Sequence, residues 1–297
     1  MRAIFFGSSA FAVPSLLDLN REHDILGVYT QADRPAGRGL KMTPTPVKTA
    51  AAAAGLPVFT PERLDGAFCE AVDALSPDVL VSVSYGKILP PRLLATPKLA
   101  ALNVHPSLLP AYRGATPIQA ALRDGLARTG VSIIWMSERM DAGDIALAED
   151  VEILPDDDFE TLHDRLAQVS ARLLARAMME LTKGTLARVA QDETAATYTR
   201  LISREDARLR LDDARRNVDV IRSLSPKPGA WLELRGKRVK VLLARAEGDA
   251  PGQPGALLSL AGEGPLIACS AGALRLLRVV PEGKPPMSGA DFARSLA

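Results

Sequence analysis

The sequence predicts an α/β domain with a mostly parallel sheet, followed by a small all-β domain. In the first part of the chain, short apolar runs alternate with helical patterns, which is typical of βαβ units. The apolar runs lie at 2–6, 25–29, 79–83 and 131–136, and helical patterns lie at 61–75 and 116–126. In the last third, short β-like runs are separated by Gly and Pro, which favours a small barrel or sandwich.

The chain opens with a strand, a turn and a helix. An apolar run from Arg2 to Phe6 ends at Gly7, and a helix-like pattern follows from Phe11 to Leu19. The turn at 7–12 lacks the glycines of a dinucleotide-binding fingerprint, so it does not predict a nicotinamide cofactor. A long helix is expected from about Asp158 to Lys183, with Asp157 or Asp158 as its N-cap.

The chain divides where the pattern changes. Residues 190–202 are polar and poor in large apolar side chains, which is typical of a linker. We therefore expect one domain at 1–189, a linker at 190–205 and a second domain at 206–297. The β-like runs of the second domain lie at 230–234, 239–246, 255–260 and 274–280.

The composition is that of a soluble globular protein with an uneven charge distribution. Of 297 residues, 47% are hydrophobic and 24% are charged, and the formal net charge is +1. From Arg204 to Ala297 there are 16 Lys or Arg and 11 Asp or Glu, so the second part is basic. This excess indicates either an anionic partner or ordinary surface variation.

The two cysteines, Cys69 and Cys269, are far apart and form no CxxC pair. We therefore expect neither a disulfide framework nor a thiolate metal site, and no metal cofactor. The N-terminal apolar run is too short for a signal peptide, and no run approaches the ~20 residues of a spanning helix. We expect a cytoplasmic monomer without a membrane partner.

The chain has three histidines, and His105 stands in the most informative surroundings. It follows an apolar run and precedes a Pro-containing loop, so it belongs at the carboxyl end of a predicted strand. Ligands bind at that end of open α/β sheets. Asn103 is two residues earlier and projects from the same face of an extended segment. Together they could stabilise an oxyanion and exchange a proton, although a polar strand end satisfied by backbone contacts explains the same pattern.

An acidic turn follows the predicted strand at 131–136. Asp141 in this turn could orient or charge-pair with His105, and Asp144 is an alternative by proximity. Spacing alone does not choose between them, and an ordinary Asp-Gly turn also explains the residues.

The segment 32–48 is a candidate contact for nucleic acid. It carries four basic residues and one acid, with Gly37 and Gly39 flanking Arg38. A basic loop of this length could follow a phosphodiester backbone, and a solvated loop is the simpler alternative.

The motifs of the chain resemble those of the methionyl-tRNA formyltransferase family over nearly the full length. The motifs that carry the resemblance are 103–110 (NVHPSLLP), 112–114 (YRG), 140–144 (MDAGD), 33–39 (DRPAGRG), 191–194 (QDET) and 286–292 (PMSGADF). The first three are similar to the signature of enzymes that use 10-formyltetrahydrofolate. The other three are similar to the tRNA enzyme within that superfamily.

The resemblance implies a Rossmann-like parallel sheet in a formyltransferase domain, followed by a small OB-type β-barrel that contacts tRNA. It implies that Asn103, His105 and Asp141 are catalytic. It also implies that the folate site is lined by Ser107, Leu108, Leu109 and Pro110, and that Arg38 and Lys41 contact tRNA. The donor would be 10-formyltetrahydrofolate, and the acceptor the amino group of methionyl initiator tRNA.

The sequence departs from the family pattern at three places away from the catalytic set. These are Ser8-Ser9-Ala10, Leu209-Arg210-Leu211 and Lys227. Two other functions stay open at this point. One is a folate-dependent formyltransferase that acts on a small amine, such as an amino-sugar nucleotide. The other is a nucleic-acid-binding protein with a relic catalytic domain, which a lost catalytic residue would favour; all three residues are present.

Overall fold

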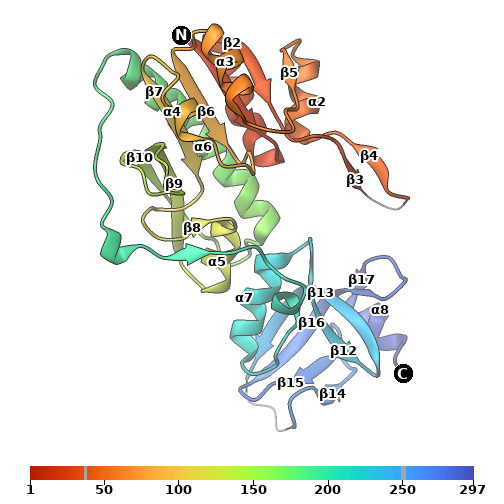
Figure 1. The fold of residues 1–297 in the computed structure, drawn as a ribbon. Helices are drawn as coiled ribbons and strands as arrows, with labels where there is room; N and C mark the ends of the chain where they lie inside the picture. The colour runs from red at the N-terminus through yellow and green to blue at the C-terminus, as the bar shows by residue number, and fades with distance from the viewer. Residues whose placement is uncertain (37–38, 249–251) are drawn as a thin grey trace. The chain divides into compact units, whose positions relative to one another are not determined.

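The computed structural model describes residues 1–36, 39–248 and 252–297. The chain divides into two compact units (Figure 1). The first unit comprises Met1–Gly114, Thr129–Val151 and His163–Tyr198, and the second comprises Ala115–Arg128, Glu152–Leu162 and Thr199–Ala297. Each unit is built on its own sheet.

A seven-stranded sheet forms the centre of the first unit, with the strand order β10-β9-β7-β6-β1-β2-β5. Its strands are β1 (Arg2–Gly7), β2 (Asp24–Tyr29), β5 (Val58–Phe59), β6 (Val79–Val83), β7 (Ala100–His105), β9 (Arg128–Trp135) and β10 (Ile145–Glu152). The five strands from β7 to β5 pair in parallel, whereas β9 is antiparallel to β7. The predicted, mostly parallel sheet is confirmed.

The middle strands carry the core of this unit. β1 and β6 lie inside the sheet, and Ile4, Phe6 and Leu80 are completely buried. Strands that are covered on both faces have continuous apolar runs instead of an alternating pattern. This is why the sequence pattern predicted both strands.

Helices connect the strands, and side-chain caps mark the start of some of them. They are η1 (Ala10–Ala12), α1 (Val13–Glu22), α2 (Pro46–Ala53), α3 (Gly66–Ala74), α4 (Pro91–Leu94) and α6 (Phe159–Thr182). Asp65 accepts a hydrogen bond from the Phe68 amide, so α3 begins later than the predicted 61–75. Asp158 accepts from the Thr161 amide at 3.0 Å, which confirms Asp158 as the N-cap of the long helix.

The basic segment 32–48 contains a short hairpin where the sequence predicted only a loop. Strands β3 (Arg34–Ala36) and β4 (Lys41–Thr43) pair in antiparallel register, and the hairpin projects away from the sheet (Figure 1). Lys41 is exposed on β4. Arg38 lies outside the described residues.

Residues 190–198 belong to the first unit and are hydrogen-bonded to it. This segment contains η2 (Glu193–Ala195), and β11 (Tyr198–Thr199) pairs with β8 (Arg113–Gly114). Thr197 accepts hydrogen bonds from two successive amides, those of Tyr112 at its Oγ1 (2.8 Å) and Arg113 at its carbonyl (2.9 Å). The segment is therefore anchored by backbone hydrogen bonds next to the loop that follows β7.

The second unit is built on a six-stranded antiparallel sheet. Its strands are β12 (Ala230–Leu234), β13 (Lys237–Glu247), β14 (Leu257–Ser259), β15 (Leu266–Ala268), β16 (Ala273–Pro281) and β17 (Met287–Ser288). The four predicted runs fall on β12, β13, β14 and β16. Arg235 and Gly236 join β12 to β13 with φ of 50° and 75°, the backbone of a two-residue hairpin turn. In the described part of the sheet, the strands form an open path from β12 to β14.

Helices complete the second unit, and the sequence did not predict all of them. They are α5 (Pro117–Arg123), η3 (Glu205–Ala207), α7 (Ala214–Leu224) and α8 (Gly289–Arg294). Helix α7 packs against β13 and α5, and it begins at Asp213, whose side chain accepts from the Arg216 amide. Among the described helices, none is both long and apolar enough to cross a membrane.

Candidate active site

Asn103, His105 and Asp141 lie together at the carboxyl end of β7. Asn103 and His105 are separated by one residue on the strand, so both side chains project from the same face. His105 is only 4% exposed. The Asn103 Nδ2 donates to Asp141 Oδ1 at 3.4 Å, and His105 Nδ1 lies 3.6 Å from the same oxygen. One carboxylate thus faces both the amide and the imidazole.

Asp141, and not Asp144, is the acid that the fold brings to His105. Its second oxygen, Oδ2, accepts from the Gly114 amide at 2.8 Å. Asp141 has φ of 53°, a conformation that a non-glycine residue adopts only where its surroundings hold it. The Asp144 carboxylate instead contacts Arg188 Nε at 3.2 Å. The ambiguity between the two acids in the sequence is therefore resolved by the fold.

The imidazole of His105 has a defined tautomer. Its Nε2 lies 2.9 Å from the carbonyl oxygen of Tyr112. Because a carbonyl only accepts hydrogen bonds, Nε2 carries a proton and donates it. In the neutral ring, Nδ1 then holds the free lone pair, and Nδ1 is the atom that faces Asp141. Proton uptake and release at this residue consequently occur at Nδ1.

The loop that follows His105 is held by its own hydrogen bonds. Ser107 is completely buried, and its Oγ donates to the Ala111 carbonyl at 2.6 Å. The Ser132 hydroxyl donates to the Ser107 carbonyl at 2.8 Å and accepts from the Leu109 amide at 3.1 Å. Leu109 is buried, and Leu108 lies against Gly130 so closely that any side chain at residue 130 would collide with it. These hydrogen bonds and contacts define the conformation of the loop, and folate binding by 107–110 stays a prediction.

A buried arginine beside the site contacts three side chains of the segment 191–198. Arg113 is 1% exposed and donates to Gln191, Glu193 and Tyr198. Arg139 contacts the same carboxylate, with 2.6 Å between its Nη2 and Glu193 Oε2. The sequence held both motifs, 112–114 and 191–194, but nothing in it showed that they touch.

The two arginines keep Glu193 ionised. Hydrogen bonds from Arg113 and then Arg139 lower the pKa of the Glu193 carboxyl from 4.5 to about 2. A carboxyl with a depressed pKa stabilises the folded state above its unfolded pKa and loses this contribution as the pH falls through the folded value. Glu193 is therefore charged at neutral and mildly acidic pH.

We expect Glu193→Gln to lower thermal stability at pH 7, because it removes the ion pair with Arg113. The difference from the wild type should shrink as the pH falls from 4.5 toward about 2, where Glu193 itself becomes neutral. Thermal unfolding of both proteins over this range measures it. A difference that stays constant across the range would contradict the ion-pair explanation.

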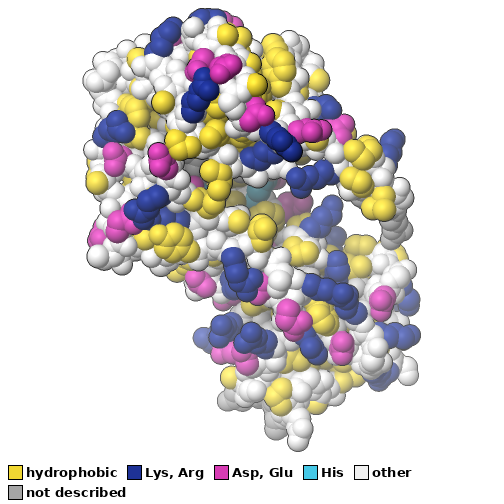
Figure 2. All heavy atoms as spheres, viewed as in Figure 1, with side chains coloured by type: hydrophobic (Ala, Val, Ile, Leu, Met, Phe, Trp, Pro, Cys, Tyr) yellow, Lys and Arg dark blue, Asp and Glu magenta, His cyan; other side chains and the backbone are white. Residues whose placement is uncertain are grey.

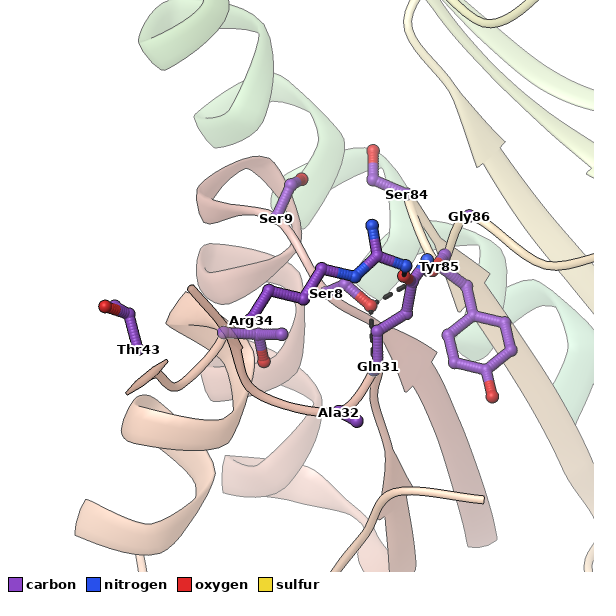
Figure 3. Close-up of a pocket in the computed structure, with 10 residues that line it drawn as sticks. Ser8, Ser9, Gln31, Ala32, Arg34, Thr43, Ser84, Tyr85 and Gly86 are labelled. Carbon is purple, nitrogen blue, oxygen red and sulfur yellow. Dashed lines mark hydrogen bonds between the residues drawn. The ribbon is translucent and has the colours of Figure 1, made fainter. Parts of the chain in front are cut away.

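A pocket of about 260 Å³ lies at the carboxyl ends of β1, β2 and β6 (Figure 3). Ser8 accepts from the Gln31 amide and donates to the Tyr85 carbonyl, and Gln31 Nε2 donates to the same carbonyl at 2.9 Å. Arg34, at the base of the β3–β4 hairpin, donates to Gln31 Oε1. The pocket thus shares an edge of the sheet with Asn103 and His105 on β7, and the side chains that line it include hydroxyls, an amide and one guanidinium.

Basic side chains are spread over the second unit together with acidic ones (Figure 2). Some are paired, such as Arg275 with Glu247 at 2.9 Å and Arg245 with Glu263 at 2.6 Å. The basic excess of this part of the chain is therefore partly neutralised by local ion pairs.

Both parts of the chain match one class of protein. Residues 1–178 match the sequence model of the family described as formyl transferase, and residues 201–297 match that of the formyl transferase C-terminal domain. The trio lies in the first of these regions.

Full-length relatives narrow the class. A methionyl-tRNA formyltransferase of Methylobacterium sp. (strain 4-46) is 45% identical over 99% of this chain and 96% of its own length. Another, of Anaeromyxobacter dehalogenans (strain 2CP-C), is 44% identical over 100% of this chain and 97% of its own length. The chain belongs to the methionyl-tRNA formyltransferase family.

Solved structures share the fold at low sequence identity. HypX from Aquifex aeolicus in complex with tetrahydrofolic acid has a TM-score of 0.67 and 19% identity, over 98% of this chain and 46% of that one. An N-formyltransferase from Helicobacter canadensis, in complex with folinic acid and dTDP-3-aminofucose, has a TM-score of 0.67 and 16% identity, over 93% and 98% of the two chains.

Proposed function

We propose that this protein transfers a formyl group from 10-formyltetrahydrofolate to the amino group of methionyl initiator tRNA, for the initiation of translation. The observation that supports it best is the contact of one carboxylate, Asp141, with both Asn103 and His105 at the end of β7. An amide donor, an imidazole and a carboxylate can supply the oxyanion stabilisation and the proton transfer that acyl transfer to an amine uses. Full-length relatives that carry the name of this enzyme support the choice of acceptor.

The proposed reaction is direct formyl transfer. The amine nitrogen attacks the formyl carbon and forms the new C–N bond, and the bond between that carbon and N10 of the folate breaks. Asn103 and the protonated ring of His105 stabilise the tetrahedral oxyanion. The proton lost by the amine passes to N10, and His105 Nδ1 can carry it because this atom holds the exchangeable site. Asp141 balances the charge of the imidazolium.

We assign the folate site to the loop of Ser107, Leu108, Leu109 and Pro110. The bonds within this loop support a fixed wall beside His105, in which the Ser107 hydroxyl holds the turn at Ala111. Neighbours of the same fold were solved with tetrahydrofolic acid and with folinic acid, which makes a folate the first ligand to test. An inactive folate analogue should raise the melting temperature of the protein, and the absence of any shift would favour a binding module with a relic domain.

We assign tRNA contacts to the β3–β4 hairpin and to the second domain. Under this proposal, residues 1–189 form the catalytic domain, 190–205 link it to the next, and 206–297 form an OB-type barrel. The exposed Lys41 and the basic Arg38 belong to the hairpin segment, and the pocket with Arg34 lies at its base. We further propose that the protein acts in the cytoplasm as a monomer.

We expect Lys41→Glu to raise KM for methionyl-tRNA about 10-fold, the equivalent of about 1.4 kcal/mol, and to leave kcat nearly unchanged. A lysine that contacts phosphate contributes equally to ground-state and transition-state binding. Its loss lowers the slope of log affinity against log salt concentration by about 1. Steady-state kinetics at several salt concentrations measure both effects. Lys183→Glu, an identical charge change on another exposed lysine, is the control.

The small-amine alternative makes the opposite prediction for the hairpin. The Helicobacter canadensis protein was solved with dTDP-3-aminofucose, so this amine is the acceptor to compare. If Lys41→Glu and Lys183→Glu have equal KM values for methionyl-tRNA, the hairpin does not contact tRNA. If the wild type formylates the amino sugar and not the tRNA, the small-amine alternative is correct.

A further inference from the structure

Gln191 is hydrogen-bonded to the turn that carries Asp141. Its Nε2 donates to the carbonyl oxygen of Asp141 at 2.8 Å and to that of Gly143 at 2.7 Å. Its Oε1 accepts from Arg113, at 3.1 Å from Nε and 2.7 Å from Nη2. Both polar atoms of this side chain therefore have hydrogen-bond partners. Nε2 contacts the turn that carries the proposed catalytic carboxylate, and Oε1 contacts Arg113.

We propose that Gln191 is a positioning residue that holds Asp141 against His105 and Asn103. The proposal rests on the proposed function, because it assumes that Asp141 takes part in formyl transfer. It gives the segment around residue 191 a part in positioning the catalytic carboxylate, although the sequence favoured a linker there.

The turn needs to be held from outside. Asp141 has φ of 53°, and a residue with a side chain is less stable in this region than in the common conformations. Gly143 lies so close to the Trp135 carbonyl that a Cβ would be 1.7 Å from its oxygen. The turn is thus bent and tight, and Gln191 bridges the two carbonyls that bracket its bend.

Only an amide satisfies both sides of this contact. The two carbonyls can only accept hydrogen bonds, and a guanidinium can only donate. The NH₂ group of Gln191 must therefore face the turn, and its oxygen must face Arg113. A carboxylate of the same length would keep the bond to Arg113 but would place an oxygen against two carbonyl oxygens.

Arg113 fixes the orientation of Gln191. Its guanidinium is buried and is itself held by Glu193, at 3.0 Å between Nη2 and Oε1, and by the Tyr198 hydroxyl at 3.2 Å. The next residue, Gly114, donates its amide to Asp141 Oδ2. The carboxylate is consequently held through its side chain by Gly114 and through its backbone by Gln191.

The test uses two substitutions of similar length, Gln191→Met and Gln191→Glu, in the full chain. We expect each to lower kcat about 100-fold, the loss that follows from misplacing a catalytic group by about 1 Å, with KM for both substrates changed less than 3-fold. Gln191→Glu keeps the contact with Arg113, so it carries the test if Gln191→Met fails to fold. Gln168→Met, at an exposed position of α6, is the control and should behave like the wild type.

A double-mutant cycle with Asp141→Asn distinguishes positioning from general stabilisation. If Gln191 acts through Asp141, Gln191→Met should add less than a 3-fold loss to kcat in the Asp141→Asn background. Losses that multiply, or Gln191 variants with wild-type kcat, would overturn the proposal. Wild-type protein that formylates no methionyl-tRNA would instead overturn the proposed function, so the two failures are distinguishable.

Discussion

Replacing His105 by Ala should lower kcat for formyl transfer by about 10²–10⁴-fold, the range for loss of a general acid–base group. The variant loses the only side chain of the trio that can both hold a positive charge beside the oxyanion and exchange a proton at Nδ1. Its fold should persist, because the polar contacts that it loses are the hydrogen bond from Nε2 to the Tyr112 carbonyl and the 3.6 Å contact of Nδ1 with Asp141. Single-turnover formylation of methionyl-tRNA measures the rate, and circular dichroism checks the fold.

His23→Ala is the matched control, since His23 caps the end of α1 just before β2, away from the carboxyl edge of the sheet. It should retain wild-type kcat. Exogenous imidazole should restore part of the activity of His105→Ala, because small molecules can fill the space that the ring leaves. Near-normal turnover in His105→Ala would refute the assignment of this residue.

Replacing Asn103 by Ala should lower kcat by about 10²–10³-fold, which is the effect of removing one oxyanion donor. Asn103 Nδ2 has a second hydrogen besides the one that points to Asp141 Oδ1, and under the proposed mechanism it meets the oxyanion. Because the donor acts on charge that develops in the transition state, KM for the folate should change little. Steady-state kinetics with varied folate separate the two constants.

Asn20→Ala, on helix α1, serves as the control for the Asn103 substitution. A rise in KM for the folate with unchanged kcat would show that Asn103 binds the ground state. That result would move the oxyanion contact to another group and would leave His105 as the main catalytic residue.

Strands β1, β2, β6 and β7 and the polar pair on β7 were predictable because they follow from local patterns. Continuous apolar runs identify strands that are buried on both faces, as for β1 and β6. The period of two along a strand places Asn103 and His105 on one face. Helix α7 was missed because its many polar residues obscured the apolar face that packs against β13.

Contacts between distant segments were not predictable from patterns. Asp141 and Asp144 are equally placed in the sequence, and only the positive φ of Asp141 and the amide of Gly114 turn its carboxylate toward His105. The bond between Arg113 and Gln191 joins residues 78 positions apart. No local sequence pattern around either residue predicts its partner. The hydrogen bonds that hold the Asp141 turn could therefore be identified only from the fold.

The most direct test of the proposed function is a formylation assay of the purified wild-type protein with 10-formyltetrahydrofolate as donor. Three acceptors should be compared at equal concentration: methionyl initiator tRNA, methionyl elongator tRNA and dTDP-3-aminofucose. Under the proposed function, we expect rapid formylation of the initiator tRNA, much slower formylation of the elongator tRNA and no formylation of the amino sugar. Formylation of the amino sugar alone would contradict the proposed function. Formylation of none of the three acceptors would contradict it as well.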